Sequence, residues 1–171
     1  MRTLLLISFL TFGIGQVTSN WNISEGYAVK FSAKKAVGTF DKLQGTVQFD
    51  PSDPTTAKFD VWLETASIST GNKTQDKHAR GNKWLAAEQY PRISFKSSEF
   101  KKTTKGYKVK GQLSIHGVTK EVSIPFAFND QVFTGKLTVN RQDYGIEGPF
   151  LFGGLVGDEI AVELLVPVTS Q

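Results

Sequence analysis

Apolar residues recur at every second position along much of this sequence, and such alternation is typical of β-strands with one buried face. Most intervals between the alternating segments contain Gly, Pro, Asn or Asp, which favour tight turns. The alternating segments are residues 27–33, 47–49, 59–63, 93–95, 107–115, 122–128, 133–139 and 160–166. About eight closely spaced antiparallel strands predict an all-β sandwich or barrel.

The first 19 residues have the layout of a secretory signal. Arg2 precedes an apolar run over residues 4–14, and Val17, Thr18 and Ser19 offer a small-residue cleavage pattern. The run is shorter than the roughly 20 residues that a helix needs to span a bilayer. We therefore predict a cleaved signal over residues 1–19, one domain over residues 20–171, and a periplasmic or secreted location. An uncleaved anchor is the alternative interpretation.

The composition excludes several classes of function. Cysteine is absent, so thiol catalysis, Cys-bound zinc, disulfides and an acylated N-terminal Cys are excluded. The net charge of +4 comes from dispersed lysines. Lys108 and Lys110, for example, alternate with apolar residues as on the solvated face of a strand. Nucleic-acid binding would need a denser basic stripe with stacking residues, so we do not expect it.

One polar stretch, residues 67–91, interrupts the β pattern and contains the best candidates for catalysis. Asn72 and Gln75 form a plausible helix-capping pair, and Gly81 is a plausible helix end. We predict a short helical insertion around residues 73–88, with a helix from residue 73 to 80 and a second turn after it. Asp76 and His78 would point in opposite directions on this helix, which favours a structural role over shared catalysis.

The second histidine, His116, precedes Gly117 where two predicted strands meet. Gly117 supplies the positive φ of a tight hairpin, so His116 is predicted to pack or cap there. The sequence contains no nucleophile elbow, phosphate-binding glycine loop or zinc-protease helix motif.

The aromatic content raises the question of a bound ligand. The chain has thirteen Phe and three Trp, and the eleven Phe and three Trp after the predicted signal are many for a small β domain. Residues 148–155 form an apolar, glycine-rich loop. An eight-stranded barrel either fills its interior with side chains or holds one slender ligand. From the residues alone, both alternatives stay open.

An ordered set of motifs resembles the YceI-like family of bacterial polyisoprenoid-binding, lipocalin-like proteins. The motifs are residues 27–34, 38–40, 45–50, 67–72, 76–78, 90–95, 111–120, 140–145 and 156–159. The resemblance implies an eight-stranded antiparallel, lipocalin-like barrel. It also implies export and a long isoprenoid chain, such as a quinone tail or a polyprenyl lipid, held inside. No catalysis and no cofactor besides that lipid are implied. The family often carries His where this sequence has Gly26 and Lys35, and this departure bears on the choice of polar head group.

We expect the lipid to contact inward-facing strand residues and a portal in the apolar loop. The expected strand contacts are Val29, Phe31, Phe49, Phe59, Val61, Leu63, Ile93, Phe95, Leu113, Ile115, Ile124, Phe126, Leu137 and Val139. The expected portal residues are Phe150, Leu151 and Phe152. Besides the lipid, we consider two further partners, namely a membrane surface contacted transiently and a second copy of the chain in a homodimer.

Two alternative functions stay open. One is a lipid-modifying enzyme that uses Asp76, His78 and His116, which requires these side chains to converge. The other is a ligand-free stress-response or interaction module for a membrane redox partner, which requires an interior filled with side chains.

Overall fold

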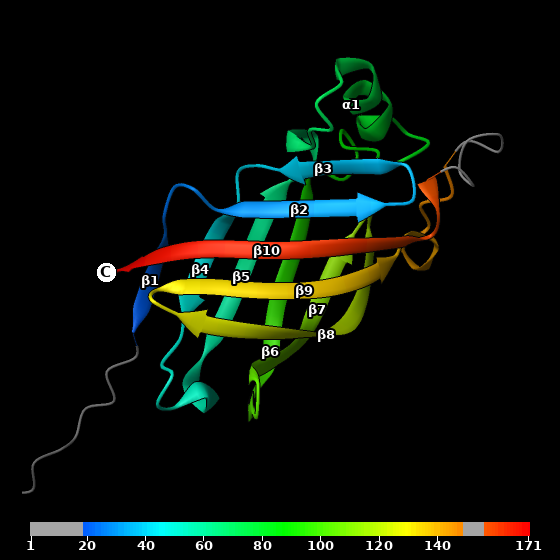
Figure 1. The fold of residues 1–171 in the computed structure, drawn as a ribbon. Helices are drawn as coiled ribbons and strands as arrows, with labels where there is room; N and C mark the ends of the chain where they lie inside the picture. Colours follow the sequence, from blue (N-terminus) through cyan, green and yellow to red (C-terminus); the bar gives the residue numbers. More distant parts are fainter. Residues whose placement is uncertain (1–18, 149–155) are drawn as a thin grey trace, which may run out of the picture.

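The computed structural model describes residues 19–148 and 156–171, and in these ranges the chain is mostly β-strand (Figure 1). The predicted signal, apart from Ser19, and the predicted portal residues Phe150, Leu151 and Phe152 lie outside the described residues. The strands are β1 (Asn20–Ile23), β2 (Ala28–Ala33), β3 (Ala36–Phe40), β4 (Gln44–Gln48), β5 (Lys58–Glu64), β6 (Arg92–Thr103), β7 (Gly106–Ile115), β8 (Val118–Asn129), β9 (Val132–Asn140) and β10 (Glu159–Ser170). The described helices are α1 (Lys73–Arg80) and the 3-10 turns η1 (Pro54–Thr56), η2 (Thr65–Ser67) and η3 (Arg141–Tyr144).

The described strands form one antiparallel sheet that closes on itself. The order is β1-β4-β5-β6-β7-β8-β9-β10-β2-β3, and β1 also pairs with β10. The ring from β1 through β4 to β10 therefore has eight strands, as predicted, and the β2–β3 hairpin extends it. The all-β barrel prediction is confirmed.

The two extra strands arise because two of the eight strand positions around the barrel are each divided between two short strands. β10 pairs with β2 along Ala161–Leu165 and with β1 along Val168–Ser170. β1 and β2 therefore lie end to end in one strand position beside β10. β3 and β4 follow each other in the same way, since β2 pairs with β3 and β1 with β4. The Tyr27 hydroxyl accepts a hydrogen bond from the Leu43 N–H at 3.0 Å and so joins the two breaks.

Aromatic side chains close the end of the barrel at which β1 lies. The ring of Phe49 packs against six other rings, with centroid distances from 5.0 Å to Tyr107 to 6.5 Å to Phe100. The members of this aromatic cluster are Phe49, Phe59, Phe100, Tyr107, Phe126, Phe128 and Phe133. Phe49 is 0% exposed, so the cluster is packed solid around it.

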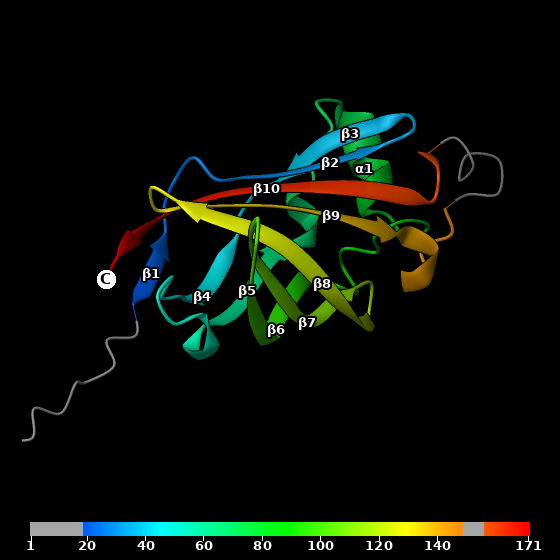
Figure 2. The same ribbon diagram turned by 60° about the horizontal axis from the view of Figure 1, so that its bottom comes forward.

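The opposite end is covered by the helical insertion. Figures 1 and 2 place α1 beside the β2–β3 hairpin, away from β1 and the C-terminus. The Asn72 side chain caps α1 by accepting from the N–H groups of Thr74 and Gln75, and the helix ends at Gly81. Residues 82–89 continue as turns, so the helix over residues 73–80 and the turn after it lie where we predicted them. We call residues 68–90 the cap.

Backbone pairing attaches the cap to β3, and side-chain hydrogen bonds brace it internally. Ser69 and Thr39 exchange backbone hydrogen bonds of 2.8 and 2.9 Å, which connect the cap to β3. The next residue, Thr70, donates its N–H and its hydroxyl to the Asp76 carboxylate, each at 2.7 Å. Arg80 donates to the carbonyl of Ile68 at 2.9 Å. The start of the cap is thus bonded to both β3 and α1.

Two strands were missed by the sequence analysis, and one was cut short. β1 and β3 have only four and five residues, too few for a clear alternation. β6 was expected to end near Phe95, but it continues to Thr103 across an irregularity between Ser97 and Glu99. This β-bulge shifts the alternation by one residue and turns Phe100 inward.

Replacing Phe49 with Ala should destabilise the fold strongly, because it leaves a cavity inside the aromatic cluster. The expected loss in the free energy of unfolding is about 3–5 kcal/mol. Urea unfolding of the two proteins measures it. Leu165→Ala is the control, since Leu165 is 44% exposed on β10 and its loss should cost less than about 0.5 kcal/mol. Equal losses in the two variants would contradict the described packing.

Acidification should weaken the contact between Thr70 and Asp76 inside the cap. The hydroxyl and the N–H of Thr70 donate to Asp76, and they hold the pKa of this carboxyl below its usual value. The unfolded pKa is about 3.9, so this stabilisation is complete above that pH and is lost as the pH falls through the lower, folded pKa. The amide NMR signal of Thr70 should therefore shift in this acidic range.

Asp76→Asn should abolish the shift, because an amide does not titrate. Asp50→Asn is the matched control, since Asp50 accepts from Ser52 elsewhere in the fold and its pKa is also lowered by that hydroxyl. A Thr70 signal that titrates identically in Asp76→Asn would refute the assignment.

Candidate functional site

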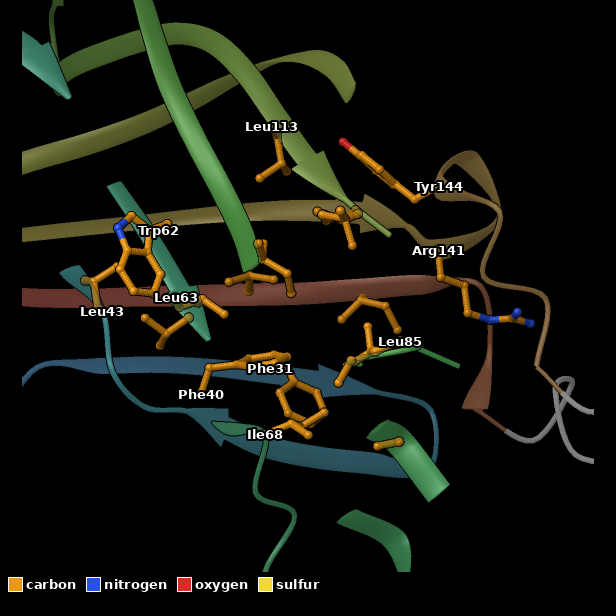
Figure 3. Close-up of a pocket in the computed structure, with 18 of the residues that line it drawn as sticks. Phe31, Phe40, Leu43, Trp62, Leu63, Ile68, Leu85, Leu113, Arg141 and Tyr144 are labelled. Atoms are coloured by element: carbon orange, nitrogen blue, oxygen red, sulfur yellow. The ribbon is translucent and has the colours of Figure 1, made fainter. Parts of the chain in front are cut away.

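The barrel encloses a cavity of about 1530 Å³ between the aromatic cluster and the cap. Inward side chains of all ten described strands contribute to its wall, which is mostly apolar. Figure 3 shows Phe31, Phe40 and Leu63 on one part of the wall, with Leu85 from the cap and Leu113 from β7 elsewhere around the space. The interior is thus packed at one end and hollow toward the other.

Almost all of the predicted strand contacts line this cavity. They are Val29, Phe31, Phe59, Val61, Leu63, Ile93, Phe95, Leu113, Ile115, Ile124, Phe126, Leu137 and Val139. Phe49 was predicted wrongly, because it is fully buried in the aromatic cluster and presents no surface to the cavity. Alternation placed it on the correct face of the sheet but carries no information about depth along the barrel. That the lining residues contact a lipid stays a prediction.

Several residues that were not predicted from the sequence also line the cavity. Ile160, Val162, Leu164 and Val166 of β10 line the cavity, and their alternation was visible in the sequence. Ile68, Leu85 and Ala87 of the cap also line it. They lie in irregular or turn structure, and no periodic signal identifies them.

Basic side chains surround the capped end of the cavity. Lys35 lies in the turn between β2 and β3, and the cap adds Lys73, Lys77, Arg80 and Lys83. Each of these residues is exposed, so their charges are solvated at the rim of the cavity. We call these five residues the basic rim.

Arg141 is a buried charge with a structural role. It is 5% exposed, and its guanidinium donates to the carbonyls of Ile146, Glu147 and Gly157 and to the Asp158 carboxylate. Its charge therefore joins the segment after β9 to the start of β10. Because these oxygens bind its nitrogens, Arg141 is a poor candidate for binding an anion in the cavity.

Tyr144, at the end of η3, is another polar residue that lines the cavity. It is 3% exposed, and burial, together with the charge of Asp143, raises the pKa of its hydroxyl. Its backbone carbonyl lies 3.2 Å from Nδ1 of His116. Figure 3 shows the Tyr144 ring extending toward Leu113, with the hydroxyl at its inner end.

The three candidate catalytic residues have separate surroundings. Asp76 accepts from Thr70, and His78 is exposed on α1. His116 sits in the β7–β8 turn with φ of 51° and packs edge-on against Tyr90 at 4.7 Å. Across residues 19–148 and 156–171, no hydrogen bond joins Asp76, His78 and His116 to one another, and no cluster of potential metal ligands occurs. The packing role expected for His116 agrees with these contacts.

Among the residues that the structure describes, no helix has both the length and the hydrophobicity to cross a membrane.

The sequence of this chain is similar to those of several bacterial UPF0312 proteins. UPF0312 proteins of Pseudomonas savastanoi and Pseudomonas syringae are 37% identical over 123 residues, which cover 66% of this chain and 64% of theirs. A UPF0312 protein of Yersinia pestis is 38% identical over 87 residues, or 51% of this chain and 45% of its own. The chain thus aligns with less than two thirds of the length of these relatives.

Several solved structures share the fold. BcnA of Burkholderia cenocepacia matches with a TM-score of 0.78 at 23% identity, covering 86% of this chain and 99% of BcnA. The YCEI protein of Campylobacter jejuni matches with a TM-score of 0.66 at 21% identity, covering 100% and 99%. A polyisoprenoid binding domain from Saccharophagus degradans, implicated in plant cell wall breakdown, matches with a TM-score of 0.64 at 13% identity, covering 90% and 99%.

The profile of the YceI-like domain matches residues 15–167, which is nearly the whole chain and includes every strand that lines the cavity. This chain belongs to the YceI-like family.

Proposed function

We propose that this protein binds a long-chain isoprenoid-type lipid in its apolar cavity and carries or stores it without chemical change. The cavity itself is the observation on which the proposal rests. Its volume of about 1530 Å³ exceeds the roughly 300–1,000 Å³ typical of pockets for drug-sized ligands. The polyisoprenoid binding domain of Saccharophagus degradans, which has a similar fold, supports the choice of ligand class.

The energetics favour such a ligand. Burying about 20 hydrocarbon carbons at roughly 0.8 kcal/mol each gives about 16 kcal/mol before the cost of ordering the chain. That cost removes much of the gain, so micromolar to nanomolar affinity is expected. An apolar wall discriminates weakly between chains that differ by one methylene, so the cavity alone should accept tails of several lengths.

The separate surroundings of Asp76, His78 and His116 favour binding over catalysis. A periplasmic or secreted location, based on the predicted signal over residues 1–19, is part of the proposal. Transient contact with a membrane would allow a water-insoluble lipid to be taken up and released.

Native mass spectrometry of protein purified without detergent tests the proposal directly. We expect an added mass that matches an isoprenoid-type lipid and is released by organic solvent. Val162→Trp should abolish this added mass, because Val162 lines the cavity and an indole there fills space that the lipid needs.

Ala161→Trp is the matched control. Ala161 is the adjacent residue of β10, is exposed, and does not line the cavity, so lipid retention should not change. Circular dichroism confirms that both variants fold. Full retention of the lipid by folded Val162→Trp, or a wild-type protein that binds no added isoprenoid lipid, would rule the proposal out.

A further inference from the structure

We propose that the Tyr144 hydroxyl is a hydrogen-bonding subsite for the head group of the bound lipid, and that it selects a neutral, oxygen-bearing head group such as a quinone carbonyl. This inference rests on the proposed function and adds to it the position and chemistry of the head group.

The Tyr144 side chain is held in place through its backbone. η3 is capped by Asn140, whose side chain accepts from the Gln142 N–H at 3.0 Å. Gly145 ends it in the left-handed conformation, with φ of 68°. Together with the contact between His116 and the Tyr144 carbonyl, these interactions fix where the ring enters the barrel. A fixed position is what a recognition group requires, because little freedom is lost when the ligand binds.

The hydroxyl of this ring has no partner within the part of the chain that the structure describes. Every fully buried side-chain nitrogen or oxygen among the described residues has a partner, so this unpartnered hydroxyl is not sealed in protein and is accessible to a ligand. By contrast, the hydroxyls of Tyr27 and Tyr107 bond to the N–H of Leu43 and the carbonyl of Pro51. Tyr144 is nine-tenths buried and more, lines the cavity, and directs its hydroxyl into it (Figure 3).

The surroundings of the hydroxyl favour a neutral partner. The wall near it is formed by apolar side chains such as Leu113 and Ile146, in which an ionised group would be poorly solvated. The guanidinium of Arg141 is bonded to protein oxygens. The basic rim is exposed to solvent, so an ionised phosphate would be stabilised at the rim instead of beside Tyr144. A carbonyl, ether or hydroxyl oxygen suits the phenol as a hydrogen-bond partner.

The position of Tyr144 also sets the direction of the lipid. η3 follows the end of β9 that lies at the capped end of the barrel, whereas the aromatic cluster closes the other end. A head group bonded to Tyr144 therefore leaves the tail to extend along the cavity toward Phe126 and Phe133, which line its deep end.

Tyr144→Phe tests the subsite, because it removes the hydroxyl and keeps the ring. Three probes with the same four-isoprene tail are compared by equilibrium binding: a naphthoquinone, the phosphate monoester and the hydrocarbon without a head group. We expect the variant to bind the quinone about tenfold more weakly, the loss of roughly one hydrogen bond. Binding of the hydrocarbon should not change.

Tyr107→Phe is the matched control, because the Tyr107 hydroxyl donates to the Pro51 carbonyl, away from the cavity, and its loss should leave all three affinities unchanged. Equal weakening of quinone and hydrocarbon by Tyr144→Phe would show a packing effect and overturn the subsite. Unchanged quinone affinity, or a phosphate preferred over the quinone regardless of Tyr144, would also overturn it while leaving lipid binding intact. Failure of the wild type to bind any probe would instead refute the proposed function.

Discussion

The structure depends on two neighbouring breaks in the sheet, one between β1 and β2 and one between β3 and β4, which one hydrogen bond joins. Residues 24–27 separate β1 from β2, and residues 41–43 separate β3 from β4. The Tyr27 hydroxyl accepts a hydrogen bond from the Leu43 N–H and so joins the two breaks. On the side of the breaks where β1 lies, β1 pairs with both β4 and β10 and closes the barrel. On the side where β2 and β3 lie, β3 is joined to the cap through the isolated bridge between Thr39 and Ser69. Continuous strand pairing therefore closes the barrel only at the β1 end, and the two halves of the barrel can be filled differently.

The interior follows this division. The fully paired half is filled by the aromatic cluster, whose rings pack edge to face and supply a large buried area from few residues. This half gives the domain a solid core in the absence of disulfides. The other half is left hollow, and its wall continues into irregular structure at Ile68 and Leu85. The solid core and the cavity therefore occupy different ends of one barrel and share Phe59, Phe126 and Phe133 where they meet.

The sequence predicted the elements whose signal is local and periodic, and missed those that depend on three-dimensional closure. Alternation identified the long strands and the faces that point inward, including Phe95 and Leu113. It did not separate the buried Phe49 from the lining residue Phe59, because depth along a barrel depends on which strands pair and in what register. The β6 bulge and the short strands β1 and β3 broke the period. Tyr144 carries no periodic signal, and only the closed structure shows that its hydroxyl faces the cavity.

The two ends of the barrel also differ in what holds them, and this difference bears on how a lipid would enter. The aromatic end is sealed by packed rings and continuous strand pairing, so opening it would expose part of the core. The cap pairs with β3 through the Thr39–Ser69 bridge, and its Trp84 and Leu85 pack against the core. The Thr70–Asp76 and Arg80–Ile68 contacts brace the cap internally. Gly38 is required at this seam, because a Cβ there would lie 2.3 Å from the Ser69 carbonyl oxygen. Ile68, Ala86 and Ala87 of the cap are buried, so apolar packing also holds this end. Opening the capped end would break one bridge and local packing, whereas opening the aromatic end would break continuous strand pairing.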